Sequence, residues 1–455
     1  MFTRAALIFI LCISNSIQLF SQQFKLPQGI REFDEPDAVM TDDYVFVTGK
    51  HSYPDGIAII ALNRKTQKAT GFVADYEAST FAGYRETEND VDLYLREGQK
   101  GVLMVRFSKT SDEFGKPREV TNKDNKYPVV IVTEEGAVVL SYERFLKRLT
   151  LLKDDGVNTV ADSIYILRKD DDMHEYLRGV EASNSYNPDF EPTYYGQRWH
   201  WRDNRLVMID DDFDVKGSEN ETIRITTLDP KDRSITYQAF ELEHKRGATH
   251  KSYLFEGKLF VVAMDKEGKY FDSEYIAIDI YDFKTLTKIK GNHYSYQQLF
   301  MPRAGNAYKN NEKIAIKNVV TSGIFTAIGR GAIGNPVITV NNAGDSLLEV
   351  MIGNLKSGGG ERIPMATYGG AGGAPTFVSA PVGRYSEQLT FIIGLMDKST
   401  LQPLDRQWKM SNSEERRLDW LDAHKKKAKN TAIARRNGKV VIVSLDKNKI
   451  EVSDL

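Results

Sequence analysis

Segment 194–202, Tyr-Tyr-Gly-Gln-Arg-Trp-His-Trp-Arg, is the densest cluster of aromatic and polar side chains in the 455-residue sequence. Flat aromatic rings beside arginine and histidine can stack on sugar rings and grip a carboxylate. Our candidate ligand-binding residues are therefore Trp199, His200, Trp201 and Arg202. The alternative is structural, because Trp199 and Trp201 would share one face of a strand and large aromatic side chains are usually buried.

A second candidate site is acidic. Asp210, Asp212 and Asp214 occupy alternate positions, as the first ligands of a calcium-binding loop do. The sixth position of such a loop is usually glycine, but here it is Val215, and no glutamate follows at the place that would complete the loop. We therefore expect no cofactor, with calcium as the alternative. A calcium site predicts that chelation lowers the melting temperature.

No recognised catalytic motif accompanies these residues. The seven histidines form no H-E-x-x-H pair, and the chain has neither a G-x-S-x-G elbow nor a Walker loop. Acid–base hydrolysis needs two carboxylates across a cleft, and 63 acidic residues give no way to choose a pair from sequence alone. Whether the chain is an enzyme stays open. Our first hypothesis is a binding or scaffold protein with a protein or glycan partner, and the alternative is a carbohydrate-active hydrolase or lyase.

A repeated hairpin pattern must position these candidates. An apolar strand leads into a polar turn built on Asp or Asn with Lys, Ser or Thr, whose side chains bond the nearby backbone. Such turns begin at residue 63 and again at 229, 282, 341, 397 and 446, so the later turns are 53, 59, 56 and 49 residues apart. Weaker copies lie near 108–109 and 168–169. Each period predicts three or four antiparallel strands.

One such sheet cannot bury both of its faces, whereas sheets stacked radially around an axis bury one another. In this pattern the chain resembles β-propeller proteins at the fold level. The resemblance implies an all-β fold with a single propeller of about seven blades, six to eight being compatible with the period. We expect residues 85–190 to hold one long-looped blade. The last three strands should close the ring with an N-terminal strand.

One short helix is predicted near the C-terminus. Ser411 can cap it, Glu414 stands three residues later, and Trp420 belongs to its apolar patch.

The N-terminus has the pattern of an export signal. Arg4 precedes an apolar run over residues 5–13, and the small residue Ser21 precedes Gln22. We expect residues 1–21 to be a signal peptide and residues 22–455 to be the propeller domain. The expected location is periplasmic, on the cell surface or secreted. Cys12, the only cysteine, lies in the signal segment, so the mature chain would have no disulfide.

Charge and hydropathy exclude two classes of partner. A net charge of −2 argues against a nucleic-acid binder, which usually carries a basic excess. No segment after the N-terminal run is apolar enough to span a membrane, so we expect no transmembrane span in the mature chain.

Overall fold

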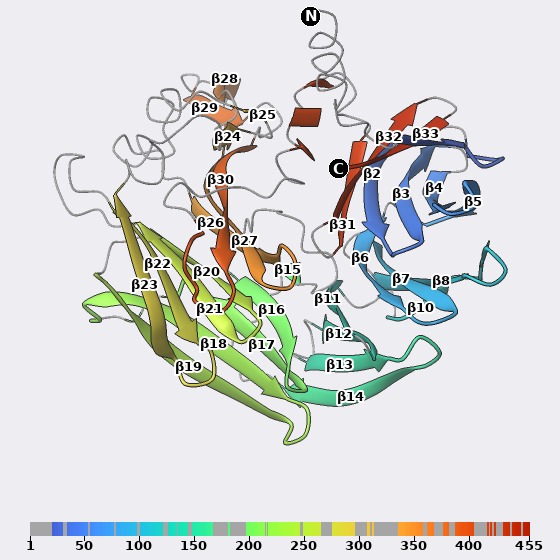
Figure 1. Cartoon of the computed structure of the whole chain (residues 1–455). Coiled ribbons are helices and arrows are strands. Elements are labelled where there is room, and N and C mark those ends of the chain that lie inside the picture. Colours follow the sequence, from blue (N-terminus) through green and yellow to red (C-terminus); the bar gives the residue numbers. More distant parts are fainter. Residues whose placement is uncertain are drawn as a thin grey trace, which may run out of the picture.

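Seven largely antiparallel sheets, each of four or five strands, follow one another around a common centre (Figure 1). The computed structural model describes residues 21–30, 34–52, 55–76, 79–97, 101–121, 126–133, 135–143, 148–166, 181–182, 197–213, 215, 217–245, 249–264, 275–295, 307–309, 312–313, 335–357, 362–367, 376–381, 387–404, 416–417, 419–420, 423–424, 431–436, 439–446 and 449–455. The predicted all-β propeller of about seven blades is confirmed.

We number the blades in chain order. Blade 1 comprises β2 (Asp34–Met40), β3 (Tyr44–Ser52), β4 (Asp55–Asn63) and β5 (Lys68–Ala74). Blade 2 comprises β6 (Ser79–Glu86), β7 (Asp90–Glu97), β8 (Gly101–Ser108), β9 (Glu113–Phe114) and β10 (Arg118–Glu119). Blade 3 comprises β11 (Lys126–Thr133), β12 (Gly136–Glu143), β13 (Arg148–Asp154) and β14 (Thr159–Ile166).

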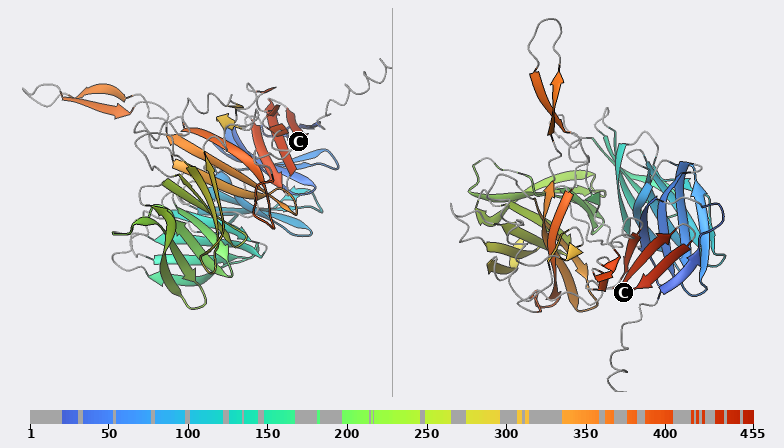
Figure 2. Two further views of the ribbon diagram at one scale, coloured as in Figure 1. Left: turned by 60° about the vertical axis from the view of Figure 1, so that its left-hand side comes forward. Right: turned by 90° about the horizontal axis from the view of Figure 1, so that it is seen from above.

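Blade 4 comprises β15 (Glu181–Ala182), β16 (Gln197–Arg202), β17 (Arg205–Asp210), β18 (Asn220–Asp229) and β19 (Ser234–Lys245). Blade 5 comprises β20 (Thr249–Phe255), β21 (Lys258–Met264), β22 (Tyr275–Asp282) and β23 (Thr287–Ser295). Blade 6 comprises β24 (Ala307–Lys309), β25 (Glu312–Lys313), β26 (Asn335–Asn342), β27 (Leu347–Ser357) and β30 (Glu387–Asp397). A separate hairpin, β28 (Arg362–Thr367) with β29 (Thr376–Pro381), projects from the ring between β27 and β30 (Figure 2).

Blade 7 closes the ring by joining the two ends of the chain. Its strands β31 (Thr431–Arg436), β32 (Lys439–Asp446) and β33 (Lys449–Asp454) are completed by β1 (Ser21–Lys25). Ser21 lies opposite Ser453, and Lys25 lies opposite Lys449. The prediction that an N-terminal strand closes the ring is therefore confirmed.

The apolar runs of the middle strands are continuous because both faces of each sheet are covered by neighbouring blades. In β4, Ala58, Ile60 and Leu62 pack with blade 7. The alternate residues Ile57 and Ile59 pack with blade 2. Similar buried clusters join blades 2 and 3, 3 and 4, 4 and 5, and 5 and 6. The core is thus a series of inter-blade layers around the ring.

In one segment, the number of blades differs from the prediction. Residues 85–190 were expected to form one long-looped blade, but they hold most of blade 2 and all of blade 3. The turn of blade 3 is at Asp155, not near residue 168. The turns predicted at 341 and 446 agree with the structure. Strands β26 and β27 pair on either side of the first, and β32 and β33 pair on either side of the second.

The predicted C-terminal helix is represented by helical residues at 416–417, 419–420 and 423. The His424 amide donates to the Trp420 carbonyl at 3.0 Å, a helical spacing. Trp420 packs on Ile442 of β32. The proposed capping residues Ser411 and Glu414 lie outside the described residues.

A polar turn is built in the same way in several blades. Asn63 Oδ1 accepts the amides of Lys65 and Thr66 at 3.0 Å each, and Asp282 Oδ1 accepts the amide of Thr285 at 2.8 Å. The last residue of each turn has a left-handed backbone: φ is 56° at Gln67, 55° at Asp112, 51° at Arg233, 54° at Leu286 and 54° at Leu401. Side chains with a Cβ are strained in this region.

Replacing exposed Gln67 by glycine is therefore expected to raise the free energy of unfolding by about 0.5–1 kcal/mol. Urea denaturation monitored by circular dichroism would measure the change. Thr66→Gly is the control, since Thr66 has no left-handed backbone, and it should lower stability. Equal effects of the two variants would contradict the turn geometry.

At the turn of Asp397, the free energy of unfolding should depend on pH. The hydroxyl of Ser399, and the amide and hydroxyl of Thr400, all donate to its Oδ1 and lower the pKa of Asp397 to about 2. Because the pKa is depressed in the folded state, its stabilisation is present above the unfolded value near 4 and is lost as pH falls toward 2. Asp397→Asn keeps an acceptor oxygen and should flatten the decline in unfolding free energy between pH 5 and pH 3. An unchanged slope in urea titrations would rule out this contribution.

Candidate functional site

The predicted ligand-binding residues lie on β16 of blade 4 and point to two different sides of it. Trp199 and Trp201 pack toward blade 3. His200 is paired in register with Val207, which belongs to the cluster shared with blade 5. Arg202 lies against Gly257 of blade 5, where an added Cβ would come within 2.6 Å of its guanidinium. The structure therefore does not bring the four side chains together on one surface.

Trp199 fills the layer between blades 3 and 4. Its side chain has 0% exposure and shares a cluster with Val129, Leu140 and Tyr165 of blade 3. Trp201 is only partly buried at the edge of the same cluster, and Lys153 Nζ lies 5.5 Å from its ring centre. In this position the Trp199 ring presents no face to a ligand arriving from solvent.

The predicted acidic residues lie where β17 ends, at the end of the ring where the first strands of the blades begin. Asp210 is 3% exposed and accepts from Arg224 Nη2 at 2.8 Å. Asp212 has a side chain that is 72% exposed, and its Oδ1 lies 3.7 Å from Lys251 Nζ. Asp214 lies outside the described residues. Within the described part of the chain, no group of three or more His, Cys, Asp or Glu side chains is arranged to hold a metal ion.

The links from this end of blade 4 to the first strand of blade 5 were not predicted from the sequence. Asp211 is 7% exposed and accepts from the amide of Ser252 at 3.0 Å and from its hydroxyl at 2.6 Å. His250 Nδ1 lies 3.6 Å from Glu221 Oε2, and the imidazole is 5% exposed. We call Asp210, Asp211, Asp212, Glu221, His250, Lys251 and Ser252 the rim cluster. One feature of the sequence pointed to the contact of Asp211. It lies two residues after Ile209 and four after Val207, so it is expected on the same face of the strand, toward blade 5.

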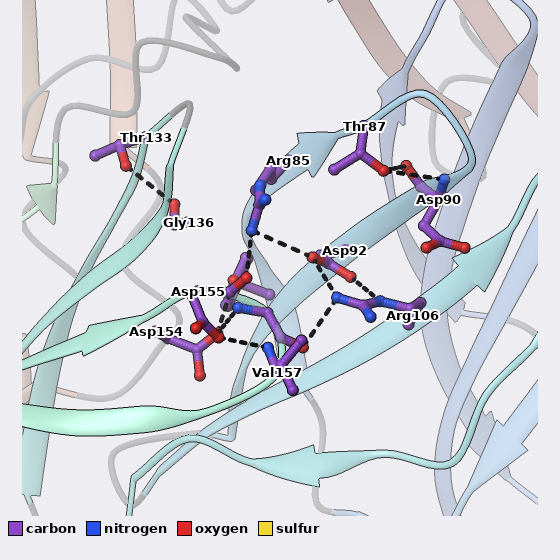
Figure 3. A network of polar contacts seen from close by, with 12 residues as sticks. Arg85, Thr87, Asp90, Asp92, Arg106, Thr133, Gly136, Asp154, Asp155 and Val157 are labelled. Carbon is purple, nitrogen blue, oxygen red and sulfur yellow. Dashed lines mark hydrogen bonds and ion pairs between the residues drawn. The ribbon is translucent and has the colours of Figure 1, made fainter.

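A second polar network joins blades 2 and 3 at the opposite end of the ring (Figure 3). Asp92 is completely buried and accepts from Arg106 Nε at 2.6 Å and Nη2 at 3.0 Å. The same Nη2 donates to the Gly156 carbonyl at 2.9 Å, while Arg85 donates to the Asp155 carbonyl at 2.6 Å. Gly156 has φ of 87°, and a Cβ there would lie 2.4 Å from Asp92 Oδ2. Glycine is therefore required at this close approach.

Asp154, beside this network, completes the contact between the two blades. Tyr94 OH donates to its Oδ1 at 2.9 Å, and Arg118 pairs with its Oδ2 at 2.5 Å. Burial, and then the charge of Asp154, raise the pKa of Tyr94 far above its usual range, so the phenol remains a donor. Tyr94 and Asp154 thus form a fixed structural contact.

A third buried group joins the outer strands of blades 4 and 5. Asp279 Oδ2 lies 2.9 Å from Lys288 Nζ and 3.0 Å from His244 Nε2, and Asp279 is completely buried. Burial alone would raise the pKa of Asp279, but hydrogen bonds from His244 and Lys288 outweigh it and hold that pKa below its usual value. The carboxylate therefore stays charged and holds one blade to the next.

Among the described residues, these charged clusters share one property: their members come from two neighbouring blades and contact one another. The arrangement provides rigid cohesion between blades. At the rim it leaves the Asp212 carboxylate exposed on a fixed base. No helix in the described residues is long and apolar enough to cross a membrane.

Comparisons with known proteins give similarity to solved structures only. No family model and no curated protein matches the chain. The β-propeller domain of the trilobed protease from Pyrococcus furiosus is 9% identical with a TM-score of 0.31, covering 82% of this chain and 79% of that one. Hydrazine synthase from Kuenenia stuttgartiensis is 11% identical with a TM-score of 0.33, covering 73% and 80%.

Apo AztD from Citrobacter koseri is 12% identical with a TM-score of 0.31, covering 56% of this chain and 58% of that one. At these identities and TM-scores the matches carry no information about function. The strand order and the ring closure of the chain itself establish its propeller architecture.

Proposed function

We propose that the chain is an exported, non-catalytic β-propeller that binds a protein or glycan partner through the rim cluster. The observation that carries the proposal is the Asp212 carboxylate, which is 72% exposed at the rim, whereas Trp199 is buried between blades 3 and 4 and lines no site. Trp199 is thereby assigned to cohesion between the blades. The N-terminal pattern of residues 1–21 supports export.

The rim cluster supports a binding role because its exposed part stands on a rigid base. Asp210 and Asp211, the two residues before Asp212, are both held by hydrogen bonds, which for Asp211 are buried. The Asp212 amide also donates to Asp210 Oδ1 at 3.2 Å, so the backbone that carries the exposed carboxylate is already fixed and loses little freedom on binding. A carboxylate paired loosely with Lys251 suits a partner that offers hydroxyl groups or a cationic side chain.

Binding and hydrolysis can be distinguished in one assay. The purified mature chain is mixed with a panel of soluble polysaccharides and of envelope proteins, and both retention and newly released reducing ends are measured. We expect retention of one partner without release of reducing ends. Asp212→Lys should weaken retention about tenfold or more, whereas Asp232→Lys, at an exposed turn at the other end of the ring, should not.

Release of reducing ends would instead support the carbohydrate-active hydrolase or lyase. Equal retention by the two lysine variants would remove the rim cluster from the binding site. Export is tested separately by expressing the full chain and a chain without residues 1–21 in a Gram-negative host. The full chain should reach the periplasm or the medium, and cytoplasmic retention of both forms would contradict export.

A further inference from the structure

The outer strand of blade 3 has an unusual surface. Among the described residues, seven large apolar side chains are exposed, and four of them lie within residues 157–166: Val157 at 62%, Val160 at 62%, Ile164 at 47% and Ile166 at 80%. Three of these belong to β14, the last strand in the order of its sheet. Clustered exposed apolar side chains are typical of an interaction site.

Both faces of β14 carry part of this surface. Ile164 and Ile166 are paired with Thr150 and Arg148 of β13. A register shift in the strand pair then places Val160 opposite Lys153, whose ammonium group lies over the Trp201 ring of blade 4. Val160 therefore lies on the side of blade 4. Ile164 lies on the other side, because its neighbour Tyr165 packs toward blade 4.

The edge of β14 is also open in the described structure. Its backbone pairs with β13 on one side, and no described strand lies on the other. An outer strand is usually protected against pairing by charged side chains. The outer strand β19 has Glu241 and Glu243, and β23 has Lys288 and Lys290. In contrast, β14 has a single charged residue, Asp162, which is paired with Lys153 at 3.4 Å.

We propose that β14 is a dimerisation edge on which β14 of a second copy of the chain adds as an antiparallel strand. The edge lacks a pairing strand. The β14 strand of a second copy supplies one, because it offers the same row of backbone donors and acceptors flanked by valine and isoleucine. Because Asp162 is neutralised within its own blade, the two edges can approach without like-charge repulsion. Two identical antiparallel strands are related by a two-fold axis. When they pair, the two blades form one continuous sheet, and the apolar side chains stay on its two faces.

Sedimentation velocity of the mature chain over a hundredfold range of concentration tests the proposal. The wild-type protein should shift from monomer to dimer, and Ile164→Lys should raise the dimer dissociation constant about tenfold or more. Ile289→Lys on β23 is the matched control, because Ile289 is also 47% exposed on an outer strand. The control variant should dimerise as the wild type does.

Hydrogen exchange on the wild-type chain provides a second measurement that does not depend on a variant folding. The amides of residues 159–166 should become more protected as the concentration rises, while those of β23 stay unchanged. A wild-type monomer at every concentration, equal effects of the two lysine variants, or protection of β14 in the monomer would overturn the proposal. The dimer does not depend on the rim cluster, so either proposal can fail alone.

Discussion

Replacing Asp92 by asparagine is expected to lower the free energy of unfolding by about 2–3 kcal/mol. The carboxylate is completely buried and accepts two hydrogen bonds from Arg106. Breaking a fully buried ion pair costs about 3–5 kcal/mol, and the partial exposure of Arg106 reduces this value. An asparagine amide would also place a donor against a guanidinium group that has only donors. Urea denaturation monitored by circular dichroism measures the change.

Asp90→Asn is the matched control, since Asp90 lies two residues earlier on the same strand and is only partly buried. It should change stability by no more than about 0.5 kcal/mol. Similar losses in the two variants would mean that the network between blades 2 and 3 does not hold them together.

Replacing Trp199 by alanine is expected to lower the free energy of unfolding by about 3–5 kcal/mol, the usual range for a buried tryptophan. The indole has no exposed surface, so its removal leaves a cavity between blades 3 and 4. Trp201→Ala serves as the comparison. This ring is partly exposed, and its loss should cost roughly 1–2 kcal/mol.

The two tryptophan variants also separate the structural role from a binding role. If Trp199 stacked on a ligand, Trp199→Ala would keep its stability and lose binding. We expect the opposite for Trp199→Ala, namely a large loss of stability and unchanged partner binding in the fraction that remains folded.

The blades that were predicted from the sequence are those whose turns have a recognisable local hydrogen-bonding pattern. The turns at Asn63, Asp229, Asp282 and Asp397 were recognised because their side chains bond their own backbone, an effect encoded within five residues. The turn of blade 3 was missed because its residues, Asp-Gly-Val-Asn, differ from the pattern in the other blades. Without that turn, two blades were predicted as one.

The polar contacts between blades could not be read from the sequence because they depend on the face of a strand and on the register between sheets. Asp92, between Val91 and Leu93, gave a partial signal, since it is a charge within an apolar strand. Nothing in the sequence pairs it with Arg106 across the next strand. In the same way, Asp211 and Ser252 are 41 residues apart and meet only because two blades pack together.

The central claim is that Trp199, which the sequence suggested as a ligand-binding residue, instead joins blades 3 and 4. Fluorescence of a variant that keeps Trp199 and has phenylalanine at positions 201, 408 and 420 tests it most directly. We expect blue-shifted emission that iodide does not quench and that added oligosaccharides do not change. Red-shifted emission that iodide quenches, with protection by an oligosaccharide, would place Trp199 in a ligand site and contradict its burial between blades 3 and 4.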